Sequence, residues 1–175
     1  MDYFIDFFFL TIVYFLFFYR KWRKKSKREL VIHTLMYVYV AMVLFVTLMP
    51  FTIPFGGTNQ LFMKTANLIP FRDLMLSHKG AIRELLLNIG MMTPFGILYP
   101  IVSRKGVLTT VALTFFFSLI IEFSQLLSSW WGGLHARTFD VTDLITNTLG
   151  GLIGYLIFIV IKPVVKKLNF RCDQA

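Results

Sequence analysis

The chain has 175 residues, of which 57% are hydrophobic and 17% aromatic, with a formal net charge of +9 and a mean hydropathy of +0.69. A soluble domain of this size cannot bury so much apolar surface, so the composition excludes an ordinary globular protein and indicates a polytopic membrane protein. The single cysteine, Cys172, excludes an internal disulfide.

Five apolar runs are long enough, or nearly so, to cross a bilayer, which takes about 20 residues per helix. They cover residues 3–19, 30–51, 81–102, 107–127 and 144–161. The first run has Asp2 and Asp6 at its start and a basic segment from Arg20 to Arg28 after it. This polarity is the reverse of a secretory signal and predicts an uncleaved anchor. The stretch 61–76 is too interrupted to span, so we expect it to lie in the interface or to re-enter the bundle.

The basic residues predict the orientation of these spans. Thirteen of the 18 Lys and Arg residues fall in segments 20–28, 104–105 and 162–171, which alternating spans place on one side. Cytoplasmic loops are enriched in Lys and Arg, so the N-terminus is predicted outside and the C-terminus in the cytoplasm. The basic segment 20–28 is expected to hold this topology and to touch anionic lipid rather than nucleic acid.

We therefore predict an all-α, polytopic membrane helical bundle of about five transmembrane helices. Residues 1–29 would form an anchor helix and a basic loop, residues 30–162 a membrane domain, and residues 163–175 a cytoplasmic tail. In the fifth run, Gly150-x-x-x-Gly154 predicts close packing of two helices. In the third run, Pro94-Phe95-Gly96 predicts a kink or local unwinding, and hence a cleft open at the outer end.

Carboxylates and amides interrupt three of the predicted spans near the same outer end. Glu122 is the clearest case, because a charged residue at the centre of a membrane helix costs about 2.5–3.5 kcal/mol and indicates a function by default. Glu84 and Asn88 share one face of the third span at a spacing of four. We predict one outward-facing polar pocket. Its expected ligand-binding residues are Asn88, Glu122, Gln125, Arg137, Asp140, Asp143 and Asn147.

Each of these residues also has a purely structural interpretation. Glu122 can clamp two helices by bonding to Arg137 or Asn147. Arg137, Asp140 and Asp143 can cap the fifth helix, where acidic residues suit the helix dipole. The alternative is that Arg137 binds an anionic headgroup.

A divalent cation held by Glu122, Asp140, Asp143 and His135 would have suitable oxygen ligands, but the spacing matches no recognised metal loop. We therefore predict neither a metal site nor a cofactor. The sequence also has no Gly-x-Ser-x-Gly nucleophile, no phosphate-binding glycine loop and no zinc-ligand spacing.

Several short motifs follow one another between residues 67 and 155. They are Asn67-Leu68-Ile69-Pro70-Phe71, Asn88 with Pro94-Phe95-Gly96, Glu122-x-x-Gln125, and the series Arg137, Asp140, Asp143, Asn147, Gly150 and Gly154. Their order and spacing resemble the VanZ-like family. The resemblance implies a multi-pass protein of the cell membrane of a Gram-positive bacterium. It also implies a part in resistance to teicoplanin, a lipid-bearing glycopeptide, without altered peptidoglycan precursors.

Three classes of function remain open. The favoured one is a non-enzymatic envelope protein that binds a lipid-linked cell-wall precursor or the antibiotic, with Arg137 on the anionic group and Glu122 and Gln125 as hydrogen-bonding groups. The second is an intramembrane enzyme that modifies a lipid-linked envelope component, with Glu122 as general acid or base and Asp143 as an orienting residue. The third is a lipid transporter or flippase subunit, which no inverted repeat supports. The expected partners are membrane lipids, without nucleic acid, and a homo-oligomer is compatible with each class.

Overall fold

The computed structural model describes residues 3–49, 64, 66–130 and 139–172, and for 164–172 it describes only the helical backbone. Over these residues the chain is helical, apart from turns and one isolated bridge between Asn67 and Asp140. Five of the described helices are long and apolar enough to cross a membrane. They are Tyr3–Trp22, Lys27–Thr47, Ala81–Ser103, Val107–Trp130 and Val141–Pro163. The predicted all-α bundle of five spans is confirmed.

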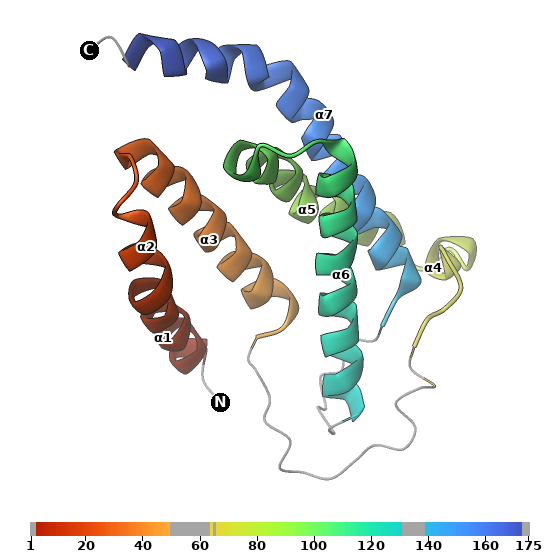
Figure 1. Cartoon of the computed structure of the whole chain (residues 1–175). Helices are drawn as coiled ribbons and strands as arrows, with labels where there is room; N and C mark the ends of the chain where they lie inside the picture. Colours follow the sequence, from red (N-terminus) through yellow and green to blue (C-terminus); the bar gives the residue numbers. More distant parts are fainter. Residues whose placement is uncertain (1–2, 50–63, 65, 131–138, 173–175) are drawn as a thin grey trace.

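The first two spans form a hairpin at one edge of the molecule (Figure 1). The first is α1 (Tyr3–Val13), a π-helical segment η1 (Tyr14–Tyr19) and α2 (Arg20–Trp22); the second is α3 (Lys27–Thr47). The Ser26 side chain caps α3 by accepting a hydrogen bond from the backbone of Glu29. Two side-chain hydrogen bonds tie the hairpin together, Tyr14 Oη to Thr34 Oγ1 at 2.7 Å and Tyr37 Oη to the Leu10 carbonyl at 2.6 Å.

The remaining spans, α5 (Ala81–Ser103), α6 (Val107–Trp130) and α7 (Val141–Cys172), form a tightly packed trio. A Cβ on Gly150 would meet the carbonyl of Ile89, and one on Gly154 would meet the carbonyl of Thr93. A Cβ on Gly151 would likewise meet the side chain of Thr114 on α6. The close packing predicted from Gly150-x-x-x-Gly154 is confirmed, because α5 approaches the backbone of α7 at these glycines.

The third span does not unwind at Pro94. Helix α5 continues from Ala81 to Ser103 through both Pro94 and Pro100. Of the two predicted alternatives, the local unwinding is therefore wrong, and the kink stays a prediction. Proline is tolerated inside membrane helices because neighbouring helices and small adjustments compensate for the missing backbone hydrogen bond.

The buried and exposed residues of this fold reverse the pattern of a water-soluble protein. Side chains with less than 2% exposure are mainly polar: Glu122, Asn147, Thr110, Thr114, Ser118 and Ser129, with Met92 and Ile121 beside them. Large apolar side chains face outward, including Phe4 at 80%, Leu108 at 82% and Val160 at 76% exposure. Such a surface is stable in contact with lipid, so the chain is a multi-pass membrane protein.

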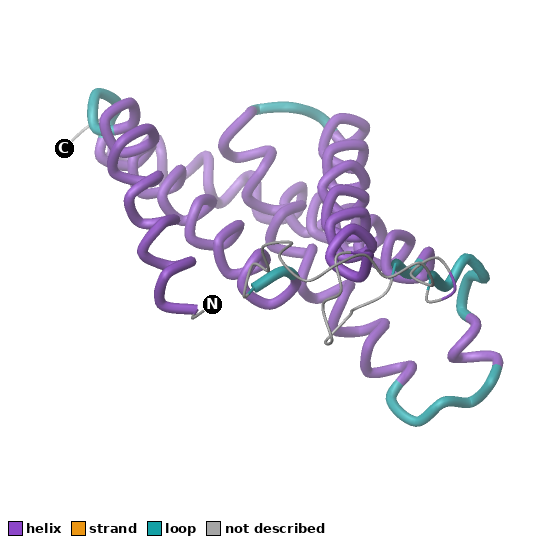
Figure 2. Tube along the Cα trace, turned by 90° about the horizontal axis from the view of Figure 1, so that it is seen from below, coloured by secondary structure: helices purple, strands orange, loops and turns teal. Residues whose placement is uncertain are grey.

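The segment before α5 folds back onto the start of α7. It contains a short helix, α4 (Arg72–Met75), on the side of the bundle away from both chain ends (Figures 1 and 2). The Asn67 N–H donates to the Phe139 carbonyl at 2.8 Å, and the Val141 N–H donates to the Asn67 carbonyl at 3.0 Å. This docking sets the α4 segment beside the carboxylates of α5 and α7. Whether residues 61–76 lie in the interface or re-enter the membrane stays a prediction.

Candidate functional site

The predicted site residues that the structure describes gather at the end of the trio where α6 finishes and α5 and α7 begin. We call this the polar end, and its centre is Asp140. One carboxylate oxygen of Asp140 accepts from the Asn67 side-chain amide at 2.9 Å, and the other accepts from the Thr142 N–H at 2.6 Å. The second bond caps the first turn of α7. Asp140 therefore serves both as a helix cap and as the anchor for the segment that precedes α4.

Two buried side chains of α6 form hydrogen bonds with the backbone of neighbouring segments. Glu122 is 2% exposed, and its Oε2 accepts from the Asp140 N–H at 2.9 Å. The Gln125 side-chain amide donates to the Thr47 carbonyl, at the end of α3, at 3.2 Å. The clamp predicted for Glu122 thus has a described partner in the backbone of Asp140. Of the two partners expected from the sequence, Arg137 lies outside the described residues, and the Asn147 side-chain amide donates to Ser118.

Two amides join the trio laterally. The Asn88 side chain on α5 donates to Asp143 Oδ1 on α7 at 2.6 Å. One turn deeper, Asn147 donates to the Ser118 hydroxyl on α6 at 2.9 Å. Asn147 is 1% exposed, and its side-chain oxygen has no hydrogen-bond partner among the described residues. Asn88 thus joins α5 to α7, whereas Asn147 joins α7 to α6.

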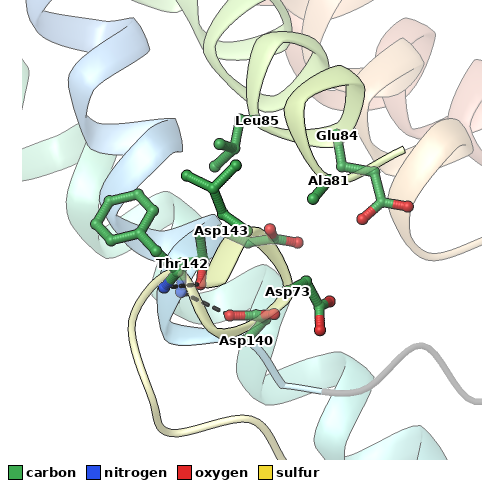
Figure 3. Close-up of a pocket in the computed structure, with 9 residues that line it drawn as sticks. Asp73, Ala81, Glu84, Leu85, Asp140, Thr142 and Asp143 are labelled. Atoms are coloured by element: carbon green, nitrogen blue, oxygen red, sulfur yellow. Dashed lines mark hydrogen bonds between the residues drawn. The ribbon is translucent and has the colours of Figure 1, made fainter. Parts of the chain in front are cut away.

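A small pocket opens between the α4 segment and the first turns of α5 and α7 (Figure 3). Its cavity of about 20 Å³ has room for one water-sized group. Four carboxylates line it, together with apolar side chains and one hydroxyl. The lining residues are Asp73, Glu84, Asp140 and Asp143, with Phe71, Leu74, Ala81, Leu85 and Thr142. Groups that accept hydrogen bonds thus converge beside apolar walls.

The backbone is strained at the rim of this pocket. Phe71 has a φ of 58°, in the left-handed region that bulky residues rarely adopt. Its N–H donates to the Thr142 hydroxyl at 2.9 Å. Such strain costs about 1–3 kcal/mol, persists only where surrounding contacts hold it, and is frequent at binding sites. The sequence marked Phe71 only as the last residue of the Asn67–Phe71 motif.

Two of the seven predicted ligand-binding residues, Asp140 and Asp143, line the pocket directly. Asn88 and Glu122 do not line the pocket, but each forms a hydrogen bond with a residue that does. Asn88 donates to the Asp143 side chain, and Glu122 accepts from the backbone of Asp140. Gln125 is directed toward the end of α3 and Asn147 toward α6.

The sequence did not single out Asp73 or Thr142, because neither has a distinctive local pattern. Glu84 was marked only by its spacing from Asn88. His135 lies outside the described residues. Within the described part of the chain, no group of three or more His, Cys, Asp or Glu side chains could hold a metal ion.

Comparison with known proteins identifies the family. The family model described as VanZ/LLP1 matches residues 34–162, which includes α5, α6 and about the first two thirds of α7. The chain belongs to the VanZ/LLP1 family. It is also 30% identical over 96 residues to Protein VanZ of Enterococcus faecium. That alignment covers 54% of this chain and 53% of the relative, so the chain spans about half the length of the curated relative that it matches. No solved structure matches the chain.

The VanZ/LLP1 match includes the pocket. Every residue that lines it falls within residues 34–162. Helices α1 and α2 and the π-helical segment between them fall outside the match. The polar end is thus part of the region that the family shares, whereas the first span is not.

Proposed function

We propose that this VanZ/LLP1 protein acts in the bacterial cell membrane by binding one hydrogen-bond-donating group, from the polar head of an amphipathic or lipid-linked envelope molecule, in the pocket at the polar end. In this role it would contribute to resistance to lipid-bearing glycopeptides such as teicoplanin. The observation that carries the proposal is the convergence of four carboxylates beside apolar side chains in one pocket. A site with acceptors at its centre and apolar walls suits an amphipathic ligand.

The carboxylates restrict the chemistry of that ligand. Ionised Asp and Glu side chains only accept hydrogen bonds, so the bound head must offer donors such as hydroxyl or ammonium groups. Cell-wall precursors and glycopeptides are rich in such groups. An anionic group of the ligand would bind elsewhere, and Arg137 remains the residue predicted for it. The apolar tail would lie along the lipid-facing side chains of the bundle.

The position of Glu122 favours binding over catalysis. A general acid or base must come within hydrogen-bond reach of the reacting group. Glu122 is not among the described residues that line the pocket, and its carboxylate accepts from the backbone of Asp140. Its described contact therefore stabilises the entry to α7. This supports the non-enzymatic role over the intramembrane enzyme.

The pocket carboxylates provide the test. The double variant Asp73→Asn and Glu84→Gln keeps the size of both side chains and removes two charges from the rim. We expect it to lower the minimum inhibitory concentration of teicoplanin at least fourfold in a susceptible bacterium that expresses the chain, because each lost charge-assisted hydrogen bond is worth about tenfold in affinity. Immunoblots of the membrane fraction check that the protein level is unchanged.

Glu29→Gln is the matched control, since it removes a carboxylate at the opposite end of the bundle. It should leave protection intact. Envelope lipids and glycopolymers should be chemically the same with and without the protein. Full protection by the double variant would refute the binding role of this pocket, and altered envelope chemistry would favour the enzyme.

A further inference from the structure

A second cavity, of about 700 Å³, lies at the opposite end of the bundle from the polar end. The start of α3, the end of α5, the turn into α6 and the middle of α7 enclose it. It shares no lining residue with the acidic pocket. Nothing in the proposed function of the polar end accounts for it.

The walls of this cavity are strongly basic. Arg28, Arg104, Lys105 and Lys162 line it, against one carboxylate, Glu29. In the described part of the chain, no ion pair involves Arg104, Lys105 or Lys162. Arg28 has interactions of its own, so the argument rests on the other three cations. Cations that converge on one cavity without carboxylate partners favour an anionic ligand.

The fold brings two of these charges together at the turn between α5 and α6. Arg104 ends α5 in the left-handed conformation, with a φ of 57°, and its N–H donates to the Pro100 carbonyl at 3.0 Å. The chain then passes directly into α6 at Val107, which keeps Arg104 and Lys105 on one short turn. Helix α3 starts at Lys27, so its N-terminus adds the positive end of a helix dipole to the same region.

The lining of the cavity also includes apolar side chains. Pro100 and Phe158, both buried, line it together with Ile32 and Ile101. A cavity lined by both cations and apolar side chains matches the two parts of a membrane lipid, whereas a free anion would use only the cations.

We propose that this cavity binds the phosphate-bearing headgroup of an anionic membrane phospholipid. Arg104, Lys105 and Lys162 contact the phosphate group, and the upper acyl segments lie against the apolar lining residues. The positive-inside prediction puts this end on the cytoplasmic side, where anionic headgroups attract clustered basic residues. The site is independent of the acidic pocket and of its ligand.

The test uses the full chain purified in neutral detergent, with its thermal unfolding midpoint as the readout. Phosphatidylglycerol should raise the midpoint and phosphatidylcholine should not. Lys105→Gln with Lys162→Gln should weaken the phosphatidylglycerol effect about tenfold or more in lipid concentration, since two charge-assisted contacts are lost. Lys21→Gln with Lys24→Gln removes the same charge from residues that do not line the cavity, and it should keep the wild-type response.

Three results would overturn the proposal. The first is an equal response to both lipids, and the second is an equal loss in the test and control variants. The third is a full response to inorganic phosphate alone, which would assign the cavity to a soluble anion. Native mass spectrometry of the unaltered chain gives a second measurement that needs no variant. Preferential retention of phosphatidylglycerol supports the site, and equal retention of both lipids refutes it.

Discussion

The helix trio α5–α6–α7 and the hairpin of α1 with α3 are both apolar and membrane-spanning, but they are built differently. In the trio, glycines bring α5 and α7 into backbone contact, and buried polar side chains bond across the helices. In the hairpin, aromatic rings of α1 and η1 meet rings of α3, and only Asp6 of α1 is buried. Hydropathy alone does not distinguish these two regions, whereas the placement of small and polar residues does.

The difference is related to the extent of the family match. The acidic pocket lies in the trio and its approach segment, and the VanZ/LLP1 match covers these together with most of α3, but not the first span. The match begins at residue 34, inside α3. Perturbations of the trio should therefore affect folding and activity together, while perturbations of the first span should have small effects.

Gly154→Leu should have the largest effect. The new side chain would collide with the backbone carbonyl of Thr93, which cannot move without shifting α5. Overpacking typically costs about 1–3 kcal/mol, and a backbone collision should exceed that range. We expect loss of the monodisperse protein in size-exclusion chromatography after detergent extraction. Gly90→Ala is the control, because a Cβ at Gly90 meets nothing within 4 Å. Equal recovery of both variants would contradict the proposed packing.

Glu122→Gln should have an intermediate effect. Glutamine can still accept from the Asp140 N–H, but it replaces a charge-assisted hydrogen bond with a neutral one, a loss of about 1–2 kcal/mol. The thermal midpoint should fall, and teicoplanin protection should persist. A variant that stays folded at the wild-type level but gives no protection would instead support Glu122 as a catalytic acid or base.

Tyr37→Phe should have the smallest effect. It removes the hydroxyl that donates to the Leu10 carbonyl and keeps the ring contacts between η1 and α3. The expected loss is about 0.5–1.5 kcal/mol, confined to the first span. Limited proteolysis should show faster cleavage near α1 and unchanged protection of α5–α7. Destabilisation of the trio by this variant would show that the two regions are coupled.

The sequence predicts the spans well because membrane helices need long apolar runs. It also predicts the packing of α7, since Gly150-x-x-x-Gly154 is a local pattern with one clear physical meaning. Asp140 and Asp143 could be placed together because helical spacing puts them on one face. These successes all depend on signals contained within one helix.

The rest of the site depends on contacts between distant segments. Asn67 and Asp140 are 73 positions apart, and Phe71 and Thr142 are 71 apart. No local sequence pattern predicts contacts between residues so far apart in the chain. The buried Thr110, Thr114 and Ser118 also look like ordinary members of an apolar run. Helix α5 continues through Pro94 because neighbouring helices compensate for the missing backbone hydrogen bond. Only the assembled bundle shows which of these residues face inward.

The bond between Asn67 and Asp140 also sets an order of events during biosynthesis. At a translation rate of about 5–20 residues per second, Asn67 is made roughly 4–15 s before Asp140 exists. During that interval the ribosome must deliver α5 and α6, while Asn67 and Asn88 still lack their acidic partners on α7. The polar end is therefore one of the last parts of the protein to form. A chain arrested before residue 140 should carry four of its five spans and no ligand pocket.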